Sequence, residues 1–215
     1  TGGERKVWGV FAEWSLPLLT ARPGAHDLTM TVATRHENGL TNRASATVPK
    51  VGLRWQPFGD SVTLRASGSK GFRQPSLHEL YSTQTASLYP IQHPLTGLNE
   101  PEQAVTVAGN RRLAAEKTKY LNMGIVWSPQ LGPRTGLSLG VDYWEAYRRG
   151  TVTNNYQDTV NRFFGRDPAG GTAPGGLLPG EGVQLNPDGS INSVNSVFVN
   201  LGRTSVAGFD YSLSH

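Results

Sequence analysis

The sequence lacks cysteine altogether, which excludes a disulfide framework, a cysteine-ligated zinc site and a catalytic thiol, and leaves either redox compartment open. It also lacks a concentrated run of lysine and arginine, and the net charge is only +4, so we expect no nucleic-acid partner. Apolar runs stay short of the roughly 18 residues of a membrane-spanning helix, and the opening TGGERKV has no signal-peptide core. We therefore expect either a cytosolic protein or an internal piece of a longer one.

What the sequence does have is strand-like alternation. Apolar and polar residues alternate with a period of two in seven segments, which predicts β-strands with one apolar and one mostly polar face. These segments are 8–16, 28–35, 50–56, 62–67, 120–127, 137–144 and 197–214. No segment predicts a convincing helix, so the expected fold class is all-β.

The connections between these segments are of two kinds. Short, proline-bearing turns are expected at 17–26, 57–60 and 129–134, all at one edge of the sheet. The other edge carries 37–46 and two long loops of about 71–116 and 149–195. Transmembrane β-barrels sort their connections in this way, with short periplasmic turns and long extracellular loops. The sorting therefore favours a partial antiparallel transmembrane β-barrel.

Three tryptophans support the same interpretation. Trp14, Trp55 and Trp127 each lie two or three residues before a proline that is expected to open a short turn. Their parity places all three on the apolar face, which predicts a membrane-interface belt at one height. The alternative is three core tryptophans of a soluble β-sandwich.

The opposite face of the predicted strands is charged. It carries Glu13, Arg35, Lys50, Arg54, Arg65, Asp142 and Asp210. Periodicity alone does not distinguish a face in bulk water from one lining a hydrated lumen, but the sorting of the loops favours a lumen.

Several motifs, in order, resemble those of one family. The segment LRASGSKGFRQPSLHELY (64–81) resembles a segment of TonB-dependent outer-membrane receptors in which an ascending strand enters an extracellular loop. We therefore expect the chain to leave the β-ladder at Gly71, ahead of Pro75. Arg111, Ala114 and Ala115 depart from the family's pattern. The other similar segments are VFAEWSLPL (10–18), VPKVGLRWQPFGDSVTLRAS (48–67), GNRRLAAEKTKYLNMGIVWSP (109–129), LSLGVDYWEAYRRG (137–150) and NLGRTSVAGFDYSLS (200–214).

The resemblance implies an architecture and a function. The family builds a barrel of about 22 strands around an N-terminal plug, so residues 1–215 would supply about seven strands of a barrel segment whose plug domain and C-terminal strands are absent. It implies residence in the outer membrane of a Gram-negative bacterium, in contact with outer-membrane lipid. It further implies import of a scarce nutrient (siderophore-iron, cobalamin or oligosaccharide) driven by the TonB complex through the missing plug region, with no cofactor. The charged face would then contact the plug.

The resemblance also implies that residues in the two long loops capture the ligand. Aromatic and arginine side chains offer stacking surface and bidentate donors for carboxylates or hydroxyls. The candidates are Tyr81, Tyr89, His93, Arg111, Arg112, Arg149, Tyr156 and Arg162. For each of them, an ordinary solvated loop position is the alternative.

Other functions find less support. The segment GLSLG (136–140) matches a nucleophile motif, but Ser138 lies in an alternating strand where that motif needs a sharp turn and a helix, so no enzymatic activity is expected. The segment NPDG (186–189) offers oxygen ligands for calcium, although a tight turn is the expected structure and no metal site is predicted. Two non-enzymatic alternatives stay open: a soluble carbohydrate-binding β-sandwich, and a passive porin or adhesin barrel.

Overall fold

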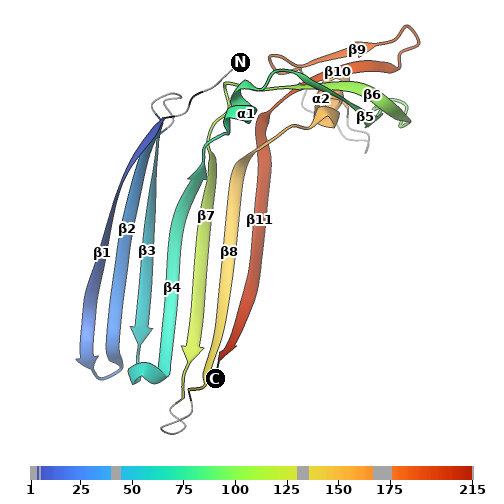
Figure 1. Ribbon diagram of the computed structural model, residues 1–215. Helices are drawn as coiled ribbons and strands as arrows, with labels where there is room; N and C mark the ends of the chain where they lie inside the picture. Colours follow the sequence, from blue (N-terminus) through green and yellow to red (C-terminus); the bar gives the residue numbers. More distant parts are fainter. Residues whose placement is uncertain (1–3, 5, 40–44, 130–135, 167–175, 215) are drawn as a thin grey trace. The chain divides into compact units, whose positions relative to one another are not determined.

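The computed structural model of the protein describes residues 4, 6–39, 45–129, 136–166 and 176–214 (Figure 1). The chain forms two compact units. The large-sheet unit comprises residues 5–74, 115–150 and 202–215, and the small-sheet unit comprises residues 1–4, 75–114 and 151–201.

The large-sheet unit is built on a seven-stranded sheet. Its order is β1-β2-β3-β4-β7-β8-β11, and the paired strands from β1 to β8 are antiparallel to their neighbours. The strands are β1 (Val7–Arg22), β2 (Ala25–Gly39), β3 (Ser45–Gln56), β4 (Val62–Arg73), β7 (Glu116–Trp127), β8 (Ser138–Thr153) and β11 (Val199–Ser214). The predicted antiparallel sheet of seven strands is confirmed, and most strands are longer than the sequence segments that predicted them.

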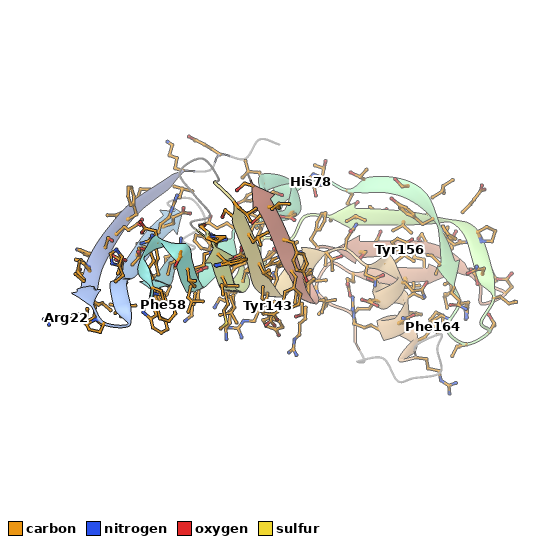
Figure 2. All side chains as sticks on the ribbon, turned by 90° about the horizontal axis from the view of Figure 1, so that it is seen from below. Arg22, Phe58, His78, Tyr143, Tyr156 and Phe164 are labelled. Atoms are coloured by element: carbon orange, nitrogen blue, oxygen red, sulfur yellow. The ribbon has the colours of Figure 1, made fainter. Side chains whose placement is uncertain are left out.

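Both faces of this sheet carry exposed side chains (Figure 2). The register places Trp14 opposite Val32, and Val32 opposite Val51, on one face. This apolar face stays open, with Trp14 54% and Phe209 60% exposed. Of the buried hydrophobic residues in the described chain, Ala25 alone belongs to the large-sheet unit. A soluble β-sandwich would bury this face against a second sheet, so the sandwich alternative does not fit.

The opposite, polar face is continuous across the strands. Glu13 lies opposite Ala33, which lies opposite Lys50, and Arg54 lies opposite Arg65. Because successive residues of a strand alternate between faces, the same register adds Arg35 and Asp142 to this face. A Cβ at Gly140 would lie 2.4 Å from the Ser212 hydroxyl of β11, which places Asp210 there as well.

The bounds of the first predicted turn are wrong. The sequence predicts a turn at 17–26, but β1 continues to Arg22 and β2 begins at Ala25, so the turn is Pro23–Gly24, with Gly24 at a φ of 73°. Pro17 lies beside a register shift between Pro17 and Leu19, and β1 ends the strand order, so the missing proline N–H is tolerated.

This correction affects the predicted tryptophan belt. Trp55 and Trp127 lie at or next to the end of their strands, whereas Trp14 lies eight residues before the last residue of β1. The premise of a turn just after Trp14 is therefore wrong. The three indoles do share the apolar face, and the membrane-interface belt stays a prediction.

The expected break at Gly71 is also wrong. Gly71 is paired with Thr118, and β4 runs to Arg73, two residues before Pro75. A Cβ at Gly71 would lie 3.2 Å from Cε2 of Tyr120. Glycine at this position therefore makes room for a neighbouring ring, and the strand ends where proline approaches.

The small-sheet unit is formed by the two long loops. They contain four strands in the order β5-β6-β10-β9, together with helices α1 and α2, where the sequence predicted neither strand nor helix. The elements are α1 (Leu77–Tyr81), β5 (Thr85–Gln92), β6 (Asn99–Ala108), α2 (Tyr156–Phe164), β9 (Gly182–Leu185) and β10 (Ile191–Val197). The only other helical segment, among the described residues, is a short turn at Gly59–Ser61.

One parallel pairing holds the two loops together. Strands β5 and β6 come from the first loop and β9 and β10 from the second, and β6 pairs with β10 in parallel, with Val105 opposite Val194. The core of this unit consists of Ile91, Val105, Val160, Ile191 and Val194, all 0% exposed. The long loops therefore form one packed structure with its own core.

Helix ends explain why α1 and α2 form. Ser76 accepts a hydrogen bond from the Glu79 amide (3.2 Å) and the Glu79 carboxylate accepts one from the Ser76 amide (2.6 Å), which is a capping box. Asn155 caps α2, and Gly165 ends it at a φ of 64°. Neither helix, in the part of the chain that is described, is long and apolar enough to cross a bilayer.

Candidate functional site

The polar face of the large sheet carries a cluster of charge at the end where β2, β4 and β8 terminate, which we call the loop end. Glu116 is 1% exposed, and its carboxylate lies 2.5 Å from the Arg73 guanidinium and 3.8 Å from that of Arg148. Both arginine side chains are 45% exposed. The buried carboxylate therefore positions two guanidinium groups that still face outward.

These residues line a groove of about 430 Å³, which we call the arginine groove. Gly71, Thr118 and Tyr120 contribute to its wall, and the Tyr120 ring is 50% exposed. Two guanidinium groups beside a phenol provide bidentate donors and a stacking surface for a ligand with anionic oxygens. This arrangement can bind such a ligand, whereas it offers no nucleophile paired with a base.

Sequence reasoning missed this groove although a signal was present. The alternation that placed Asp142 on the polar face also places Arg148 there, six residues later, and places Arg149 on the apolar face. The sequence predicts that Arg149 lies in a ligand-binding loop. It lies instead within β8, opposite Lys117, because β8 continues to Thr153.

Further along the polar face, an ion pair bridges two strands that are not neighbours. Arg65 of β4 bonds to Asp142 of β8, with 2.8 Å between Arg65 Nε and Asp142 Oδ1 and a second bond between Nη2 and Oδ2. It passes over Gly124 of β7, which lies opposite both residues. A Cβ at Gly124 would lie 2.0 Å from Asp142 Oδ1, so glycine is required for this bridge.

Replacing Gly124 by alanine is expected to break the bridge, because the new methyl group would displace the Asp142 carboxylate. We expect a loss of about 1–3 kcal/mol in the free energy of unfolding, measured by denaturant titration of the full-length protein in detergent. Gly52→Ala is the matched control on the same face, since a Cβ there meets its neighbours at 3.8 Å or more. If the double variant G124A/D142A loses the full sum of the two single losses, the bridge is not the cause.

Three predicted ligand residues, Tyr81, Arg111 and Arg112, lie in segment 75–114 of the small-sheet unit. The Arg111 guanidinium lies 5.1 Å from the centre of the Tyr81 ring, a cation–π contact at the end of α1. Arg112 is exposed, and its amide donates to Asn110 Oδ1 (2.9 Å). These three side chains remain available for a ligand.

A second group lies between β5 and α2. The rings of Tyr89 and Tyr156 stack at 4.9 Å, and Tyr89 is 40% exposed. Figure 2 shows Tyr156 and Phe164 at opposite ends of α2, beside the small sheet. Tyr89 and Tyr156 form an aromatic surface of the kind the sequence predicts, and their role in binding stays a prediction.

His93 and Arg162 have partners inside the unit. His93 is 5% exposed; its Nδ1 accepts from the Leu95 amide (3.2 Å) and its Nε2 lies 3.3 Å from the Gly189 carbonyl. Arg162 is bound to Glu181, with 2.5 Å between Nη2 and Oε1. The sequence predicts both as ligand residues, but both side chains are largely buried and bonded within the unit, so the proposed ligand surface does not include them.

The NPDG segment forms the expected tight turn. The Gly189 amide donates to the Asn186 carbonyl (2.9 Å), which joins β9 to β10. Hydrogen bonds from the Ser190 hydroxyl and amide lower the pKa of the Asp188 carboxyl. Over the described ranges, no group of three or more histidine, aspartate or glutamate side chains is arranged to hold a metal.

Comparison with known proteins gives one family. A family model described as "TonB dependent receptor-like, beta-barrel" matches residues 1–215. No curated protein matches the chain. The family and the solved neighbours are transport receptors and not enzymes, in line with Ser138 lying in a strand.

Solved structures share the fold at low identity. The siderophore receptor PirA from Pseudomonas aeruginosa is 16% identical with a TM-score of 0.61, and the match covers 97% of this chain and 31% of that one. A mutant of the ferric enterobactin receptor PfeA from Pseudomonas aeruginosa is 18% identical with a TM-score of 0.65, over 97% of this chain and 24% of that one. A double mutant of the Serratia marcescens hemophore receptor HasR, in complex with its hemophore HasA and heme, is 15% identical with a TM-score of 0.52, and the match covers 97% of this chain and 31% of that one. The chain thus spans a quarter to a third of these receptors.

Proposed function

This chain belongs to the TonB-dependent receptor family, and on that premise we propose that it forms about a third of the wall of a barrel of about 22 strands in a Gram-negative outer membrane. The rest of the barrel and a plug domain would come from the remainder of the parent protein. The receptors that the chain matches are three to four times its length, which supports this proposal.

The observation that carries the proposal is the difference between the two faces of the large sheet. One face exposes large apolar side chains from strands β1, β3, β7, β8 and β11, and the other carries ion pairs. Exposed apolar side chains on this scale are stable against hydrocarbon, whereas charges on the lipid side cost about 2–4 kcal/mol each at the bilayer midplane. The polar face would therefore enclose water and the plug.

We propose that the parent protein imports a scarce nutrient with energy from the TonB complex, and that a ferric siderophore is its substrate class, ahead of cobalamin or oligosaccharide. The arginine groove supports this choice, because two guanidinium groups suit the anionic oxygens of an iron chelate. The names of PirA and PfeA, a siderophore receptor and a ferric enterobactin receptor, point the same way.

The test uses the full-length receptor and the adjacent arginines 148 and 149, which lie on opposite faces of β8. We expect Arg148→Gln to weaken binding of a ferric tris-catecholate or ferric hydroxamate about tenfold, since a charged hydrogen bond contributes about 1.5–3 kcal/mol. Arg149→Gln should leave binding unchanged. Binding is measured by tryptophan fluorescence quenching on the purified receptor.

Uptake of radioactive iron by cells separates active import from a passive pore. Import should stop in cells that lack TonB, whereas diffusion through a passive porin would continue. Equal binding of cobalamin and the iron chelates would remove the siderophore proposal, and uptake independent of TonB would remove the transporter proposal.

A further inference from the structure

Four cationic side chains gather on the apolar face of the large sheet, at its loop end. Lys70 of β4 lies directly opposite Lys119 of β7, and Lys117 of β7 lies directly opposite Arg149 of β8. Lys117 and Lys119 are separated by one residue along β7, so all four side chains occupy two adjacent rows of the sheet. We call them the basic rows.

The pairing of like charges in the basic rows is unfavourable by itself. Side chains directly opposite each other in an antiparallel pair have Cβ atoms about 4.5–5.5 Å apart, and like charges there destabilise a sheet. None of the four cations forms an ion pair with an acidic residue in the described chain, which sets them apart from Arg65 and Arg73 on the polar face. An anion from outside the chain would remove this repulsion.

The basic rows also border a hollow surface. The β3–β4 ladder extends from Trp55–Leu64 only as far as Lys50–Ser69, and the next residue of β3, Pro49, has no N–H to donate. Two grooves of about 520 and 470 Å³ lie there, and both are lined by Lys70, Lys119 and Tyr147. The first includes Val51 and Leu121 and the second includes Phe72.

Cations beside an apolar groove match a molecule with an anionic head and a hydrocarbon tail. Glu145 is the one acidic residue lining these grooves among the residues described, and it already accepts a hydrogen bond from the Tyr143 hydroxyl (3.3 Å). A carboxylate head would satisfy one cation, whereas a phosphate offers several oxygens to lysine and arginine together. The groove beneath would hold part of an acyl chain.

We propose that the basic rows bind the phosphate of a phosphorylated glycolipid in the outer leaflet of the membrane. This inference rests on the proposed function, because it needs the apolar face to contact lipid and the loop end to lie outside the cell. At that depth the lysine and arginine side chains reach the headgroup layer, where each cation contributes to binding an anionic surface.

The test uses the full-length receptor in phosphatidylcholine nanodiscs that contain diphosphoryl lipid A or its dephosphorylated form. Retained glycolipid is counted by native mass spectrometry after detergent release. We expect the wild-type receptor to retain diphosphoryl lipid A and not the dephosphorylated form. The double variant K70Q/K119Q should retain about tenfold less.

The matched control is R35Q/K50Q, which removes two cations from the polar face of the neighbouring strands. It should retain as much lipid A as the wild type. Equal retention by K70Q/K119Q and R35Q/K50Q, or equal retention of both lipids by the wild type, would overturn the inference. If either of these results is obtained and the receptor is found in the outer-membrane fraction of cells, the proposed function stands and only the lipid site fails. If the receptor is absent from that fraction, both the proposed function and the lipid site fail.

Discussion

Replacing Glu181 by glutamine is expected to open the α2 region of the small-sheet unit. Glu181 is 1% exposed, and Arg162, its partner, is 10% exposed. The Glu181 carboxylate also accepts from Thr159 Oγ1 (3.0 Å) and from the Leu178 amide (2.9 Å). The substitution leaves a buried guanidinium without its counter-charge, which costs about 3–5 kcal/mol.

We expect amide hydrogen exchange in 156–164 to speed up by about two to three orders of magnitude, since 1.4 kcal/mol corresponds to a factor of ten. Exchange is measured by mass spectrometry on the full-length receptor in detergent, and exchange in β7 serves as the internal reference. The double variant R162M/E181M is the control, because replacing a buried ion pair with apolar residues is often neutral. If the double variant opens α2 as much as E181Q does, an unpaired charge is not the reason.

Replacing Gly109 by alanine is expected to detach α1. A Cβ at Gly109 would lie 2.7 Å from the backbone nitrogens of Tyr81 and Ser82, and 2.8 Å from the carbonyl carbon of Leu80. These are backbone atoms, so a rotamer change cannot relieve the clash. The hydrogen bonds from the Gly109 amide to the Ser82 carbonyl (3.1 Å) and from the Asn110 amide to the Glu79 carbonyl (2.8 Å) would be lost with it.

We expect this substitution to remove amide exchange protection from residues 79–82. The local free energy of opening of α1 should fall by about 1–3 kcal/mol. The same change should abolish the contact of Arg111 with the Tyr81 ring. Gly182→Ala is the matched control in the same unit, because a Cβ there meets the Asn195 side chain at an ordinary 3.7 Å. Unchanged protection of α1 in the Gly109 variant would mean that β6 and α1 are not held as closely as these distances indicate.

The large sheet could be predicted from the sequence because its signal is local. In each of its strands, alternation fixed both the element and the face, and Arg54, Arg65 and Asp142 lie on the face that their parity predicted. Strand ends were less predictable. The sequence predicts a turn at Pro17, but a register shift beside this residue lets β1 continue.

The small-sheet unit could not be predicted by the same means. Its β6–β10 pairing is parallel and joins residues almost 90 positions apart, such as Val105 and Val194, and short apolar runs do not specify such a partner. The helices did have local signals that went unused. Ser76 and Glu79 have the spacing of a capping box, and Asn155 and Gly165 mark the two ends of α2.

The parallel ladder between β6 and β10 has a practical consequence for engineering. Because Val105 and Val194 come from different connections but share one core, neither connection would keep its shape if grafted alone onto another receptor. A transplant would have to carry 75–114 and 151–201 together, as one cassette.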